Sequence, residues 1–212
     1  MKTDDLIRAL NADTGSRGPS LQAAWTGAAV TASALAALVF VILLGPRPDI
    51  AEAAETARFL FKFVVTLALA GAALFLVVRL SRPGASLALP IGLLLVAPVL
   101  LAGAVGLEFI ALPRDVWRTN WIGNNSTVCL TYIPLIGLLP LAVFVAALRH
   151  SAPTRPGLAG AVAGLLAGGV SATFYAAQCN DDSPFFVATW YPLAIAMLVI
   201  AGFIAGRLFA RW

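Results

Sequence analysis

The chain has 212 residues, of which 60% are hydrophobic and only 11% are charged, with a formal net charge of +4. A water-soluble domain carries about 25% charged residues, so this composition excludes a soluble globular domain and indicates a chain solvated by lipid. The basic residues are scattered between apolar segments instead of gathered on one face, which argues against direct nucleic-acid binding.

Residues 1–20 contain acids and no apolar core, so they are not a cleavable signal peptide. A short helix is predicted near residues 3–10, with leucine and isoleucine side chains on one face. One or two helical turns are not stable alone in water, so this helix needs a surface. Its acids oppose the negative inner leaflet, which favours a groove on a partner protein over lipid. The residues expected to contact that partner are Asp4, Asp5, Leu6, Ile7 and Leu10.

Six apolar stretches follow, each close to the ~20 residues that cross a bilayer as a helix. Clusters of proline, glycine, asparagine and aspartate separate them and are typical of tight connections. The expected fold is therefore an all-α, polytopic membrane protein with a six-transmembrane-helix bundle. The stretches are residues 21–44, 59–80, 87–107, 128–148, 158–178 and 185–205.

The basic residues predict the orientation, because cytoplasmic loops carry an excess of lysine and arginine. With the N-terminus inside, nine of the 14 basic residues lie inside and five outside, which favours N-in, C-in. The inner set is Lys2, Arg8, Arg17, Arg79, Arg82, Arg149, Arg155, Arg207 and Arg211. No ionisable residue lies in the middle of a span, and Lys62 and Glu108 lie near outer ends, where they can snorkel to water. Proton and ion pathways usually need buried charge, so a transporter is disfavoured.

The fifth span carries Gly160, Gly164 and Gly168 at four-residue spacing, on one helix face. Small residues on one face allow close approach of another helix. Packing inside the bundle is the favoured interpretation, and a homodimer seam is the alternative.

Cys129 begins the fourth span and Cys179 follows the fifth. Only a short loop joins these spans, so both thiols lie about 30 Å from it and at the same depth, on the outer side. That compartment favours disulfides in bacteria, and the bond would be either a permanent staple or a redox switch. The alternatives are that each cysteine is a small buried apolar residue, or that the two thiolates bind a soft metal ion with help from Asp181 and Asp182.

Several stretches resemble the NrsF-type anti-sigma factors, the negative regulators of sigma F. The likeness covers essentially the whole chain. It lies in the opening residues 1–10, in Gly45-Pro46-Arg47-Pro48-Asp49, in Cys129 with Ile133-Pro134, and in residues 152–191 with Tyr175, Gln178-Cys179 and Asp181-Asp182-Ser183-Pro184.

The resemblance implies a multi-pass protein of the bacterial inner membrane that is not an enzyme and needs no cofactor. Residues 1–20 would form a cytoplasmic tail that binds an extracytoplasmic-function sigma factor, and residues 21–212 a six-helix sensor domain. Cys129 and Cys179 would sense metal or oxidative stress and trigger release of the sigma factor. A membrane thiol-disulfide oxidoreductase and a small-solute transporter remain the alternatives; the first usually needs closely spaced cysteine pairs.

Overall fold

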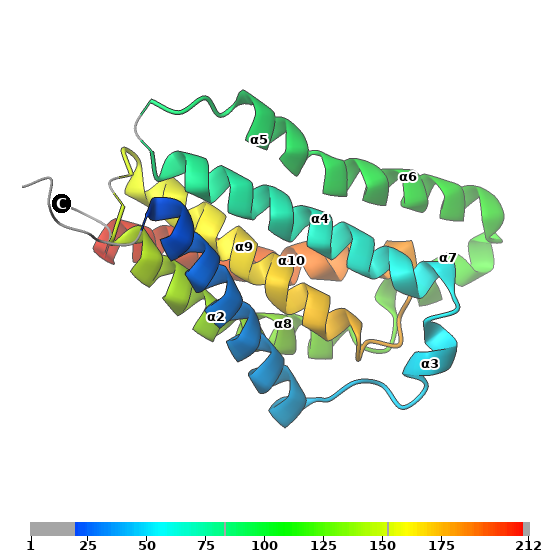
Figure 1. Cartoon of the computed structure of the whole chain (residues 1–212). Helices are drawn as coiled ribbons and strands as arrows, with labels where there is room; N and C mark the ends of the chain where they lie inside the picture. The colour runs from blue at the N-terminus through cyan, green and yellow to red at the C-terminus, as the bar shows by residue number, and fades with distance from the viewer. Residues whose placement is uncertain (1–19, 83, 152, 210–212) are drawn as a thin grey trace, which may run out of the picture.

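The computed structural model describes residues 20–82, 84–151 and 153–209, and every regular element in those ranges is an α-helix. Figure 1 shows the helices lying roughly along one direction, as in a membrane bundle. They are α2 (Leu21–Leu43), α3 (Ile50–Ala53), α4 (Ala57–Leu80), α5 (Ala88–Leu94), α6 (Val96–Ala111), α7 (Arg114–Ile122), α8 (Ser126–Leu148), α9 (Pro156–Ala176) and α10 (Pro184–Phe209).

Six segments are long and apolar enough to cross a membrane, which confirms the predicted six-span architecture. The third span differs from the single helix expected over residues 87–107, because it divides at Leu95 into α5 and α6. Pro98 lacks an N–H and its ring crowds the carbonyl of Leu94, one turn earlier. The break at Leu95 places Pro98 in the first turn of a new helix, where proline is tolerated.

The fifth span, α9, is the centre of the bundle and packs against α4, α8 and α10 (Figure 1). A Cβ atom on Gly160 would collide with the backbone of Gly202 and Gly206, and one on Gly164 with the backbone of Leu198. The predicted glycine face is therefore covered by α10 of the same chain. This confirms the interpretation that it serves packing within the bundle.

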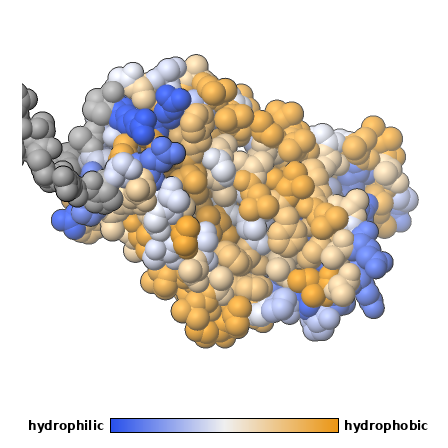
Figure 2. All heavy atoms as spheres, in the orientation of Figure 1, coloured by the Kyte–Doolittle hydropathy of each residue, from blue (hydrophilic) through white to orange (hydrophobic). Residues whose placement is uncertain are grey.

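Charge divides the described part of the molecule into two ends. Figure 2 shows hydrophilic atoms at both ends and an apolar belt between them. We call the end that holds Cys129, Cys179 and all the described acids the cysteine end; its acids are Asp49, Glu52, Glu55, Glu108, Asp115, Asp181 and Asp182. We call the other the arginine end; it holds Arg79, Arg82, Arg149, Arg155 and Arg207, together with the start of α2 and the end of α10 (Figure 1).

Candidate functional site

The structure brings the two cysteines into one buried cluster at the cysteine end. Cys129 lies in the first turn of α8, and Cys179 follows α9 in the loop that leads to α10. Both thiols are free and fully buried, and they share a hydrophobic cluster with Tyr175, Phe186 and Tyr191. Their predicted depth is thus the same in the structure, while their role in sensing stays a prediction.

The loop over residues 177–183 carries Cys179, and we call it the clamped loop because other elements hold it by ion pairs and hydrogen bonds. Asp181 accepts hydrogen bonds from the backbone N–H of Asn124 at 3.0 Å and of Asn125 at 2.8 Å, and from the Asn125 amide at 3.0 Å. These donors precede α8, so the carboxylate lies at the positive end of that helix. A side chain at Gly123 would collide with Asp181 and Phe186, and its φ of 60° also requires glycine.

Asp182 holds the clamped loop to α4 and to the connection that follows α2. Its carboxylate pairs with Lys62 Nζ at 2.5 Å and with Arg47 Nη1 at 3.1 Å. Lys62 also donates to the backbone carbonyl of Cys179 at 2.8 Å, and its side chain is 0% exposed. The expectation that Lys62 snorkels to water is therefore wrong: two partners inside the protein replace water around its charge.

Glu108 at the end of α6 holds the other side of the clamped loop. It is 3% exposed, accepts hydrogen bonds from Ser183 Oγ at 2.7 Å and from the N–H of Phe185 at 3.2 Å, and pairs with Arg58 at 3.2 Å. It too is buried and does not snorkel. Four separate segments, those carrying Arg47, Lys62, Glu108 and Asn125, thus meet on one short loop.

Burial disfavours the thiolate form of Cys179. Burial raises the pKa of Cys179, and the nearby ammonium of Lys62 opposes that rise only in part. A thiol with a raised pKa is protonated at neutral pH, and the thiolate is the form that reacts and binds metals. Also at the cysteine end, the hydrogen bond that Arg47 donates to Asp49 lowers the pKa of the Asp49 carboxyl.

The surroundings do not offer a preformed metal site. Within residues 20–82, 84–151 and 153–209, no three His, Cys, Asp or Glu side chains are grouped to hold an ion. Asp181 and Asp182, which were expected to assist a soft cation, are both engaged by amides or cations. Metal binding by Cys129 and Cys179 stays a prediction, and it would require the clamped loop to rearrange.

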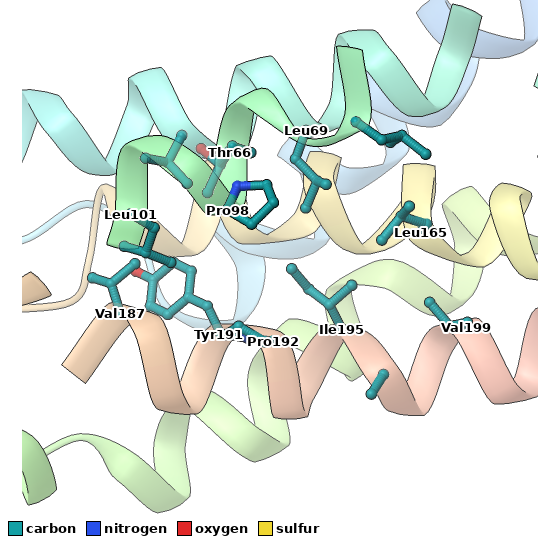
Figure 3. A pocket seen from close by; sticks show the side chains of 14 residues that line it. Thr66, Leu69, Pro98, Leu101, Leu165, Val187, Tyr191, Pro192, Ile195 and Val199 are labelled. Carbon is teal, nitrogen blue, oxygen red and sulfur yellow. The ribbon is translucent and has the colours of Figure 1, made fainter. Parts of the chain in front are cut away.

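An apolar pocket of about 360 Å³ adjoins the cysteine cluster, between α4, α6, α9 and α10. Figure 3 shows Leu101, Leu165 and Ile195 pointing into it from three of these helices. Tyr191 belongs both to its wall and to the cysteine cluster, and its ring contacts that of Tyr175 at a centroid distance of 5.8 Å. The pocket leaves the third span only partly packed against α10.

Sequence reasoning located the two thiols but missed Arg47 and Lys62 as partners of the Cys179 loop. The Gly-Pro-Arg-Pro-Asp and Asp-Asp-Ser-Pro motifs carried a signal, since the first places Arg47 and the second places Asp181 and Asp182 at the same end of the bundle. The residues expected to bind a partner protein, Asp4, Asp5, Leu6, Ile7 and Leu10, lie outside the described residues.

Comparison with known proteins identifies one family model and two relatives. Residues 10–212 match the family model described as "Negative regulator of sigma F". The chain is 38% identical to the Anti-sigma-F factor NrsF of Caulobacter vibrioides and 34% identical to the Probable anti-sigma-F factor NrsF of Azospira oryzae, over the whole length of each protein and of this chain. No solved structure matches the chain.

The family and both relatives are described as regulators, which confirms the expectation that the chain is not an enzyme. The family match over residues 10–212 includes all six spans, so the similarity extends over the whole bundle. The chain therefore belongs to the NrsF family, the negative regulators of sigma F.

Proposed function

We propose that this chain is an anti-sigma factor of the bacterial inner membrane that holds an extracytoplasmic-function sigma factor through residues 1–20. Release follows when Cys129 and Cys179 react with an oxidant or a soft metal ion. The arginine end faces the cytoplasm and the cysteine end faces outward, as the positive-inside rule favours. The relatives named as anti-sigma-F factors support the regulatory part of this proposal.

The observation that carries the sensing step is the set of bonds on the clamped loop. Cys179 contributes its carbonyl to Lys62, while the neighbouring acids hold the start of α8 and the connection after α2. Oxidation or metal binding at Cys179 must move this loop, because the thiol is fully buried and leaves no room for a new ligand. Movement of the loop then changes its contacts with all four segments that hold it.

The energies are of the right size for a switch. Lowering the affinity for a sigma factor 100-fold needs about 2.7 kcal/mol of coupling between the two ends. Forming one disulfide is typically worth 2–4 kcal/mol. In the first span, α2 packs against α8 and begins at Leu21, directly after the proposed binding segment. A shift of α8 therefore reaches the segment through one helix.

The docking step is tested by a Leu6→Asp, Leu10→Asp variant, with Ala12→Asp, Thr14→Asp as a control that adds the same charge outside the predicted helix. The sigma factor is expected to co-purify with the wild type and the control and to be lost from the first variant. Co-purification at the wild-type level in all three would show that residues 3–10 are not the docking element.

The sensing step is tested by a Cys129→Ser, Cys179→Ser variant. Because serine cannot form a disulfide or a thiolate, sigma-dependent transcription should stay low during oxidant or cadmium stress while the sigma factor still co-purifies. A normal stress response in this variant would remove both cysteines from the mechanism. Fusions of topology reporters at residue 180 and at the C-terminus test the orientation, and activity of both on one side of the membrane would contradict it.

A further inference from the structure

We infer that a groove between α2 and α4 at the arginine end binds an anionic glycerophospholipid, such as phosphatidylglycerol. The groove has a volume of about 490 Å³. Its walls come from the first turns of α2 and the last turns of α4, which lie side by side in Figure 1. It is separate from the cysteine cluster and lies at the opposite end of the bundle.

The polar end of the groove offers a site for a phosphate. Arg79 and Arg82 line it, and neither has an acidic partner among the described residues. All the described acids lie at the cysteine end, so positive charge here is uncompensated by the structured part of the chain. Arginine forms paired hydrogen bonds with phosphate oxygens, and basic pockets between transmembrane helices bind anionic headgroups.

Trp25 of α2, whose ring stacks on Phe144 of α8, places a donor that is unpaired within the described residues at the wall of the groove. Trp25 lines the groove and is 1% exposed, yet its indole Nε1 has no acceptor among the described residues. A buried N–H without an acceptor is costly, so the site favours a molecule that brings an oxygen.

The rest of the groove suits an acyl chain. The apolar walls are formed by Ala29, Val30, Leu74 and Val78. Gly71 also lines the groove and adds no side chain to it, and the space where its Cβ would lie is empty to 4 Å. A site that is cationic at one end and apolar along its length matches the two parts of one phospholipid. Free phosphate would satisfy only the first part.

The lipid lies where residue 20 enters α2, at the base of the proposed binding segment. It would also hold α2 against α4, two spans that the groove otherwise separates. Lipid binding itself does not depend on the sigma factor, so its failure and the failure of the proposed function are distinguishable.

The test uses the purified full-length protein in neutral detergent. Phosphatidylglycerol is expected to raise the thermal midpoint by about 5 °C, whereas phosphatidylcholine and inorganic phosphate leave it unchanged. An Arg79→Gln, Arg82→Gln variant should bind phosphatidylglycerol at least about tenfold more weakly, because two charge-assisted contacts are lost. The charge-matched control is Arg149→Gln, Arg155→Gln, which removes two arginines of the same end that do not line the groove.

Two further variants keep the arginines in place. Trp25→Phe removes the indole donor while keeping an aromatic ring, and should weaken binding about tenfold. Gly71→Leu adds a side chain to the groove wall, at a position where a Cβ atom has nothing within 4 Å, and should abolish the effect of the lipid. Equal loss in the control and in the Arg79, Arg82 variant would overturn the site, since general charge attraction would then explain binding. Stabilisation by phosphate alone would overturn the lipid assignment.

The acidic segment of the chain itself is the remaining competitor for the groove. In an Asp4→Asn, Asp5→Asn, Asp13→Asn variant, the affinity for phosphatidylglycerol is expected to stay within about twofold of the wild type. If the lipid binds only after this change, the segment and not a lipid is the resident occupant, and the inference is wrong.

Discussion

The ammonium of Lys62 in α4 donates a hydrogen bond of 2.8 Å to the backbone carbonyl of Cys179 in the clamped loop, which is far away in the sequence. A lysine that is 0% exposed is held there only by what surrounds it, here this carbonyl and the carboxylate of Asp182. The position of a proposed sensing cysteine thus depends on a charge in another span.

Replacing Lys62 with methionine should destabilise the bundle by about 3 kcal/mol, because the half-buried Asp182 carboxylate and the Cys179 carbonyl both lose a fully buried cation. A Lys62→Met, Asp182→Asn double variant should recover part of that loss, since the two side chains act as a pair. Thermal unfolding followed by circular dichroism measures both. Glu52→Gln, an exposed acid at the same end, is the control and should have no effect; a loss of equal size there would contradict the prediction.

Asp181→Asn should lower the free energy of unfolding by about 1–2 kcal/mol, because the amide cannot match a carboxylate that accepts several N–H groups before α8. The matched control is Asp115→Asn, an exposed acid in the first turn of α7. In cells, the first variant should also release the sigma factor without stress. Unchanged repression with a destabilised loop would separate the clamped loop from signalling.

The raised pKa of Cys179 predicts a pH dependence of alkylation. In a Cys129→Ala background, the rate of reaction with maleimide should be low at pH 7.5 and should rise only above the ordinary thiol pKa of about 8.5. The sign follows because a higher pKa leaves less thiolate at any given pH. An exposed reference thiol, Ala51→Cys in a chain without other cysteines, should react about tenfold faster at pH 7.5. A lower midpoint for Cys179 than for the reference would refute the assignment.

Gly160→Ala should cost about 3 kcal/mol, because the added methyl group meets the backbone of Gly202 and Gly206, which cannot rotate away. Gly103→Ala, in open space on α6, should instead stabilise the helix by about 0.5–1 kcal/mol. Unfolding midpoints in detergent compare the two. Equal midpoints would show that α9 and α10 separate more easily than their packing indicates.

Hydropathy alone predicts the six spans, because length and apolar composition are what a bilayer selects. It also predicts the shared depth of Cys129 and Cys179, since that follows from counting along two adjacent helices. It does not predict the division at Leu95, which places Pro98 in the first turn of α6, or the short helices α3 and α7 in the connections.

Counting residues along the spans does not predict the environment of Lys62 and Glu108. Both lie near the ends of spans, where the charge can be satisfied either by water or by a buried counter-ion, and the sequence does not distinguish the two. Which of the two applies depends on which helices are neighbours, and only the fold brings Asp182 to Lys62 and Ser183 to Glu108. The same holds for Gly123, whose small size matters because Asp181 and Phe186 lie against it.

The gathering of every described acid at one end makes the bundle an electric dipole along its long axis. An energised membrane is negative inside, and a charge that changes sides is worth about 2.3 kcal/mol per 100 mV. The membrane potential therefore favours the orientation that leaves the arginine end on the negative side. Collapse of the potential would remove that bias from newly made chains while leaving those already folded in place.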